Sequence, residues 1–108
     1  MSEKVEPAVI LADDMKAVIA ASPFIALASV SANGEPHLIV VGKAKRVEDD
    51  SRLVFGVYKM DKTRENLAAT GRLQAAVVDG KIGYRFTGTA VVQGDEVIFS
   101  VQQVATLL

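Results

Sequence analysis

The sequence predicts a mainly β protein: a small antiparallel barrel of six short strands, accompanied by two short helices. Three observations lead to this fold class. Short runs rich in Val, Ile, Leu and Phe recur along the 108 residues. Tight-turn pairs such as Asn33-Gly34 and Asp79-Gly80 separate these runs. Only two segments carry the spacing and end signals of a helix, and this combination is typical of a small barrel.

The first helix is predicted over residues 13–22, with Asp13 or Asp14 as its cap and a Ser-Pro pair as its end. A strand follows at 24–30, and its continuous apolar run predicts burial on both faces. The Asn-Gly pair after it is the strongest short-range hairpin signal. The chain is therefore expected to return as a second strand over 37–47.

A third strand is predicted at 52–57, after a polar turn, so that the first three strands form an antiparallel meander. A second helix is predicted over 62–70 and ends at Gly71, where helices favour glycine. The remaining predicted strands are 73–78, 83–92 and 96–101. Three glycines suit the bends that a closing barrel needs: Gly83, Gly88 and Gly94.

These elements are expected to form one domain over residues 1–108, a common domain size. Half of the residues are apolar and the net charge is −1, which argues against disorder and against general attraction to nucleic acid or an anionic membrane. The absence of cysteine excludes thiol catalysis and disulfides. No apolar run approaches the length that spans a membrane, and residues 1–7 lack the basic-then-apolar build of a signal peptide, so a cytoplasmic protein is expected. The apolar half is generous for so small an interior, which predicts a homodimer.

A candidate anion site lies where the third strand gives way to the second helix. Lys62 and Thr63 fall in the first helical turn, where free backbone N–H groups and the helix dipole favour an anion. Lys62 adds a positive charge and Thr63 a hydrogen-bond donor, a combination that suits the phosphate of a cofactor. The alternative is an ordinary helix capped by Asp61, with Lys62 and Arg64 solvated.

Other chemistry-bearing residues favour structural roles. His37 is the only histidine, and no acidic cluster is spaced to join it in a metal site. The acidic turn 48–50 is expected to be solvated, and it follows the basic run 43–46 so closely that a nucleic-acid patch is disfavoured. Ser29 and Ser31 lack the Gly-x-Ser-x-Gly context of a hydrolase nucleophile. We therefore expect no metal site and assign no catalytic residue.

Several stretches, taken in order and with their spacing, resemble a known family. They are Asn33-Gly34-Glu35-Pro36-His37 leading into Leu38-Ile39-Val40-Val41-Gly42, the strand 53–57, Lys62-Thr63-Arg64-Glu65-Asn66-Leu67, and Gly83-Tyr84-Arg85-Phe86-Thr87-Gly88-Thr89-Ala90. The sequence resembles the pyridoxamine 5′-phosphate oxidase-like family, the FMN-binding split barrels, from about Met15 to Val92.

The resemblance implies a six-stranded antiparallel split β-barrel that forms a homodimer and holds two FMN molecules, each in a groove between subunits. Lys62 and Thr63 fall where the family's basic and polar residues hold the FMN phosphate. The strand whose backbone lines the isoalloxazine ring matches Val40, Val41 and Gly42. Further cofactor-binding candidates from the resemblance are Arg46, near the end of that segment, and Gly56, Val57 and Tyr58, at the strand end beside the flavin.

The chain departs from the family pattern in two places. Members often carry serine, threonine or asparagine at the positions of Ile39, Val40 and Val41, so hydrogen bonds to the flavin's pyrimidine edge would come from backbone groups here. The turn 93–95 replaces a helix that relatives usually place before the last strand. The tail 102–108 is then expected to cross to the partner subunit.

Two functions of different classes follow. The first is an FMN-binding flavoprotein, an oxidoreductase or an electron carrier, in which the flavin supplies the chemistry and a small molecule or a protein is the redox partner. The second is a split barrel without flavin catalysis that serves as a binding or regulatory module. The missing side-chain donors and the negative charge of Asp61 favour the second. A related alternative is another cofactor, such as a deazaflavin or haem.

Overall fold

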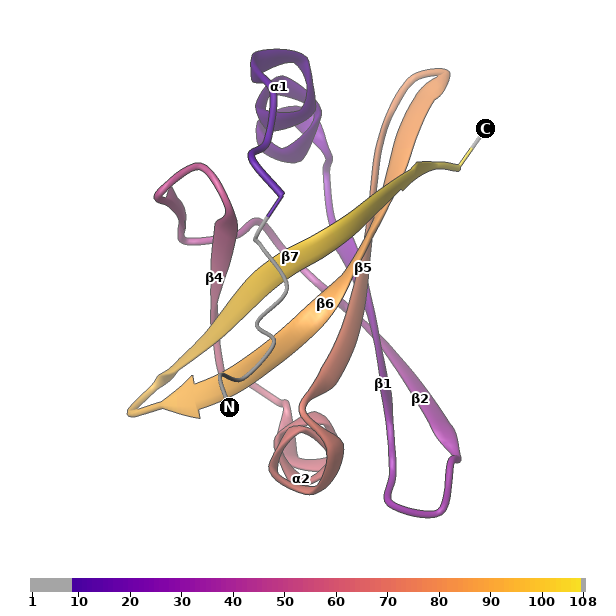
Figure 1. Ribbon diagram of the computed structural model, residues 1–108, viewed down its shortest axis with the longest axis vertical. Coiled ribbons are helices and arrows are strands. Elements are labelled where there is room, and N and C mark those ends of the chain that lie inside the picture. The colour runs from indigo at the N-terminus through magenta and orange to yellow at the C-terminus, as the bar shows by residue number, and fades with distance from the viewer. Residues whose placement is uncertain (1–8, 108) are drawn as a thin grey trace, which may run out of the picture.

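The computed structural model describes residues 9–107, which form one antiparallel sheet and two helices (Figure 1). The helices are α1 (Asp13–Ala21) and α2 (Asp61–Thr70). The strands are β1 (Ile25–Val30), β2 (Pro36–Val41), β3 (Arg46–Glu48), β4 (Arg52–Gly56), β5 (Arg72–Asp79), β6 (Ile82–Gln93) and β7 (Glu96–Thr106). No helix in this described part is long and apolar enough to cross a membrane.

The strands of the described chain form a single open sheet in the order β2-β1-β5-β6-β7-β4-β3, and all neighbours are antiparallel. The two helices lie at opposite ends of the sheet, with α1 at the top of the view and α2 at the bottom (Figure 1). The predicted mainly β class with two short helices is confirmed. The open antiparallel sheet is consistent with a split barrel.

The number and the pairing of the strands differ from the prediction. The strand predicted at 37–47 is two strands: β2 pairs with β1, and β3 pairs with β4 after the chain crosses at residues 42–45. The six-strand count and the three-strand meander are therefore wrong. The reason is that β7 takes the edge of β4 that a meander would give to β2, so β2 and β3 lie at opposite ends of the sheet.

Neither helix begins with a side-chain cap, because an alanine and a methionine occupy the two N-cap positions. The predictions that Asp13 or Asp14 caps the first helix and that Asp61 caps the second are wrong. Asp61 is itself the first residue of α2, and its carboxylate accepts a hydrogen bond from the Arg64 guanidinium at 2.9 Å. The backbone N–H groups at the start of α2 therefore have no side-chain acceptor from a cap.

Two glycines occupy backbone positions that suit no other residue. Gly71 ends α2 with a φ of 69° and donates its N–H to the carbonyl oxygen of Leu67 at 2.9 Å, which confirms the predicted helix end. Gly88 lies where the register between β6 and β7 shifts. A Cβ on Gly88 would lie 1.9 Å from the carbonyl oxygen of Ser100, so β6 and β7 approach closely only because this side chain is absent.

The hydrophobic core lies on one face of the sheet. In β1 the residues Ile25, Leu27 and Ser29 are buried and their neighbours are half-buried, so the predicted burial of this strand on both faces is wrong. Three of the largest fully buried side chains come from β4, β6 and β7: Phe55, Phe86 and Phe99. The alternation shows that the other face of β1 is left for solvent or for a partner.

One buried and one half-buried polar contact attach α2 to the sheet. The amide of Asn66, which is 1% exposed, donates from Nδ2 to the Ser29 hydroxyl at 3.0 Å. The hydroxyl of Thr70 donates to the carbonyl oxygen of Val30 at 3.0 Å. Because little water competes with such contacts, they define the placement of the helix against β1.

The chain's last described strand differs from the prediction in length. β7 continues to Thr106 and pairs with β6, with Tyr84 opposite Thr106. The prediction that the tail 102–108 crosses to a partner is therefore wrong for residues 102–106, which belong to their own sheet. Leu107 donates its N–H to the carbonyl oxygen of Gly83 at 2.9 Å, and Leu108 lies outside the described residues.

Candidate functional site

A groove between β2 and the end of β4 gathers apolar and basic side chains on the surface. We call it the β2–β4 groove. It measures about 390 Å³. Its lining residues are Ile39, Val40, Val41, Gly42, Lys43, Phe55, Gly56, Tyr58 and Lys59.

The groove follows from the strand order. β2 is at one end of the sheet and β4 is next to the other end, and the two strands share no pairing in the described chain. One edge of β2 therefore presents backbone N–H and C=O groups without a neighbouring strand in this part of the chain. Such an edge can hydrogen-bond to the polar side of a flat heterocycle. The sequence leads us to expect backbone hydrogen bonds here, because Ile39, Val40 and Val41 have no side-chain donors.

Most of the predicted ring-contact residues come together in this groove. Five of them line it: Val40, Val41, Gly42, Gly56 and Tyr58. Val57, which the sequence also suggested, is half-buried against the hydrophobic core and does not line the groove. A Cβ on Gly42 or on Gly56 would meet no atom within 4 Å, so the space beside these two backbones is open.

The two predicted phosphate anchors lie at the start of α2, outside the lining of the groove. The Lys62 ammonium is exposed and lies 3.3 Å from the Glu65 carboxylate. Thr63 is 1% exposed, and its hydroxyl oxygen has no hydrogen-bond partner within the described chain. A buried polar atom without a partner is unusual in a folded protein.

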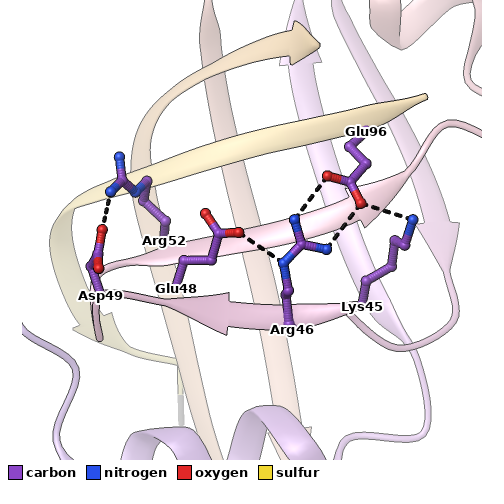
Figure 2. Close-up of polar contacts among 6 residues, drawn as sticks. All are labelled: Lys45, Arg46, Glu48, Asp49, Arg52 and Glu96. Atoms are coloured by element: carbon purple, nitrogen blue, oxygen red, sulfur yellow. Dashed lines mark hydrogen bonds and ion pairs between the residues drawn. The ribbon is translucent and has the colours of Figure 1, made fainter. Parts of the chain in front are cut away.

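Arg46, the remaining predicted residue, is engaged by carboxylates (Figure 2). Its Nη1 and Nη2 atoms donate to the two carboxylate oxygens of Glu96 at 2.9 Å each, and its Nε donates to Glu48 at 2.8 Å. The Lys45 ammonium lies 2.9 Å from the same Glu96 carboxylate. Arg46 does not line the groove. The sequence could not show this arrangement, because Glu96 is distant in the chain.

This cluster of Lys45, Arg46, Glu48 and Glu96 lies beside the strand that ends at the groove. Glu96 lies opposite Gly56 in the pairing of β7 with β4, so the cluster ties β3 to β7 across the strand that ends at the groove. Hydrogen bonds from Arg46 and Lys45 lower the pKa of Glu96 to about 2, and those from Glu96 and Glu48 raise the pKa of Arg46. Both groups therefore stay charged over the physiological range.

Lys43 and Lys59, which sequence reasoning did not select, supply the positive charge of the groove. Lys43 donates from Nζ to the carbonyl oxygens of Ala20 at 2.7 Å and Ser22 at 3.1 Å, at the end of α1. Lys59 has a φ of 56°, and its Nζ lies 5.5 Å from the ring centroid of Tyr58. A left-handed lysine after a strand has no sequence signal, which explains why Lys59 was missed.

The other chemistry-bearing residues have structural contacts. The turn residues Asp49 and Asp50 have φ values of 52° and 54°, and their carboxylates pair with Arg52 and Lys16 (the Asp49–Arg52 pair in Figure 2). Within residues 9–107, no three His, Asp or Glu side chains are grouped so as to hold a metal ion. His37 is half-buried on β2 and lies opposite Ser29.

The groove has the chemistry of a site for a flat, apolar molecule with a negative charge. Its walls are aliphatic or aromatic side chains and open glycine backbone, two lysines lie on it, and no carboxylate residue lines it. The start of α2, two residues beyond Lys59, adds backbone N–H groups without a capping side chain. The residues present thus fit a flavin that carries a phosphate.

Comparison with known proteins gives a consistent assignment of the fold. The chain matches the family model for pyridoxamine 5′-phosphate oxidase over residues 11–104. No match is found among curated proteins.

Three solved structures illustrate the likeness. HupZ of Group A Streptococcus is 24% identical with a TM-score of 0.77, and the match covers 90% of this chain and 94% of that chain. An FMN-binding protein from Syntrophomonas wolfei is 17% identical with a TM-score of 0.73, over 85% and 82% of the two chains. An F420 reductase is 14% identical with a TM-score of 0.60, over 83% and 94%. At these identities the likeness shows the fold alone.

Proposed function

The chain belongs to the pyridoxamine 5′-phosphate oxidase family, and from this premise we propose that it is an FMN-binding flavoprotein, an oxidoreductase or electron carrier. The β2–β4 groove is the observation that carries the proposal. It combines apolar walls, an unpaired strand edge and positive charge in one place. A flavin supplies hydride or electron transfer when bound, and the protein supplies position and electrostatics.

The ring of the cofactor would lie along the backbone of Val40, Val41 and Gly42. The open space beside Gly42 and Gly56 admits a flat ring at close approach. Tyr58 is 80% exposed and would cover part of the ring or meet a second subunit. Unpaired N–H and C=O groups on β2 would take the place of the side-chain donors that this chain lacks.

The phosphate would lie toward the start of α2. The backbone N–H groups there have no side-chain cap, and the helix dipole favours an anion. Lys62 and Thr63, predicted from the sequence as its anchors, stand at this helix start. The Thr63 hydroxyl has no hydrogen-bond partner within the described residues, so it is free to donate to an anion that reaches the first turn.

The proposed assembly is a homodimer in which the second subunit covers the groove. Leu38 and Val40 are exposed on β2, and Phe24 is exposed just before β1. Large apolar side chains gathered along a free sheet edge are typical of an interface. A covered groove would also exclude water from the flavin.

The first test is the near-ultraviolet and visible absorbance of protein purified without added cofactor, repeated after mixing with FMN and removing the excess. We expect a retained two-banded yellow flavin spectrum. A Gly42→Leu variant places a side chain in the open part of the groove and is expected to lose retention. Ala32→Leu, at the exposed hairpin turn, is the matched control and should retain FMN.

The other outcomes separate the alternatives. A colourless protein that does not retain FMN would contradict the proposal and favour a binding or regulatory module. A single-banded deazaflavin spectrum, for which the F420 reductase likeness is the motivation, or a Soret band from haem would assign another cofactor to the same groove.

A further inference from the structure

We propose that Lys59, rather than Lys62, provides the charge that pairs with the phosphate of the cofactor, and so selects FMN over the uncharged riboflavin. This inference rests on the proposed function, because it assigns a role within the same groove. Lys59 is the groove lysine whose ammonium has neither an ion pair nor a hydrogen bond to another residue of the described protein.

The two lysines of the groove differ in what they contact. The ammonium of Lys43 donates to two carbonyl oxygens at the end of α1, at 2.7 and 3.1 Å, so its charge already stabilises that helix end. Lys59 is exposed and forms no ion pair with any carboxylate of residues 9–107. Its contact is the face of Tyr58, a weak interaction at an exposed site.

The basic residues near the groove but outside its lining, unlike Lys59, form ion pairs with carboxylates. Lys62 pairs with Glu65 at 3.3 Å and Arg64 pairs with Asp61 at 2.9 Å, each within the first turns of α2. In both pairs a neighbouring carboxylate offsets part of the positive charge that an anion would meet. Lys45 forms an ion pair with Glu96, and Arg46 forms ion pairs with Glu96 and Glu48 (Figure 2).

The position of Lys59 in the chain joins the two parts of the proposed site. It lines the groove together with Gly56 and Tyr58, and it stands two residues before Asp61, where α2 begins. An anion paired with Lys59 would therefore lie between the apolar groove and the uncapped helix start. The φ of 56° holds this residue in a conformation that non-glycine residues rarely adopt, so the turn places the lysine at this spot at some cost in stability.

The test compares FMN and riboflavin, which differ only in the phosphate. Dissociation constants of both flavins are measured by fluorescence titration for the wild type and for Lys59→Met, Lys62→Met and Lys59→Arg. Methionine keeps the length of the side chain and its strained backbone but removes the charge. We expect Lys59→Met to lower the preference for FMN by about tenfold or more, with riboflavin affinity unchanged.

The controls decide between the two lysines. Lys62→Met should keep the FMN preference within about twofold, and Lys59→Arg should restore most of it because it restores the charge. A loss of preference in Lys62→Met with none in Lys59→Met would overturn the inference while leaving flavin binding in place. A wild type that binds both flavins equally would do the same. A wild type that binds neither flavin would overturn the proposed function, and this inference with it.

Discussion

A single residue without a side chain decides how closely two strands of the sheet can approach. Gly88 stands at the register shift between β6 and β7, against the backbone of Ser100. Glycine is needed there for space, since its φ is not in the left-handed region. Gly71 represents the other use of glycine, because its φ of 69° ends α2.

We expect Gly88→Ala to lower the free energy of unfolding by more than about 2 kcal/mol, since the added methyl would overlap the Ser100 carbonyl and β7 would have to move. Urea denaturation followed by circular dichroism measures the change. Gly56→Ala is the matched control, because its Cβ would meet nothing within 4 Å. It should stay within about 0.5 kcal/mol of the wild type. Equal effects of the two substitutions would contradict the steric argument.

At the scale of elements, the charged cluster of Lys45, Arg46, Glu48 and Glu96 joins strands that hydrophobic packing alone would hold less firmly. β3 is only three residues long, and within residues 9–107 it pairs with β4 alone. Its arginine reaches past β4 to Glu96 on β7 and forms a two-bond contact with the carboxylate. Such paired geometry is more specific than a single surface ion pair.

This contact predicts a pH dependence of stability. The pKa of Glu96 is lowered to about 2 in the folded protein, chiefly by its hydrogen bonds from Arg46 and then Lys45, below the ordinary value near 4.5 that the unfolded chain has. Its stabilisation is therefore fully present above about pH 4.5 and is lost as the pH falls toward about 2. We expect Glu96→Gln to lose less stability than the wild type between pH 5 and pH 2.

The measurement is urea denaturation at several pH values and low ionic strength. Glu65→Gln removes a carboxylate that pairs with Lys62 on the surface of α2 and serves as the control, which should follow the wild type closely. If Glu96→Gln and wild type lose stability in parallel, the cluster does not stabilise β3 in solution. High salt should weaken the difference only in part, because the pair is short and bidentate.

The elements themselves were largely predictable because their signals are local. The Asn-Gly turn led to the β1–β2 hairpin, and Gly71 marked the end of α2. The helix caps were not predicted correctly. Asp61, for example, is the first residue of α2, and the N-cap position before it is Met60. The split of the predicted strand 37–47 was missed because the crossing at 42–45 contains no proline and no Asn-Gly or Asp-Gly pair to mark it.

At the scale of the whole molecule, the strand order could not be read from the sequence. It depends on β1 pairing with β5 and on β4 pairing with β7, contacts between segments far apart in the chain. The sequence identified only part of the candidate site, because the rest depends on contacts and conformations of the folded chain. The resemblance supplied Val40, Val41, Gly42, Gly56 and Tyr58, whereas Lys59 depends on a backbone conformation and Arg46 on a distant glutamate.

The proposed homodimer gives a prediction at this scale. Leu38 on β2 and Ile10 before α1 are both 68% exposed, which makes them a matched pair. We expect Leu38→Lys to shift the protein toward the monomer in sedimentation velocity and to weaken FMN retention, since a charge would be buried at the interface. Ile10→Lys should leave both unchanged. A wild type that sediments as a monomer at micromolar concentration would contradict the dimer.

The two ends of the sheet differ in how they meet other β-structure. β3 is short and carries Arg46 and Glu48, and charged short strands resist the addition of a foreign strand. β2 is twice as long, with exposed Leu38 and Val40 and one backbone edge that no strand of residues 9–107 pairs with, and such a strand is a template for aggregation when it is left uncovered. The same edge that suits a flat ligand and a partner subunit thus makes the uncovered protomer the species most exposed to misassembly.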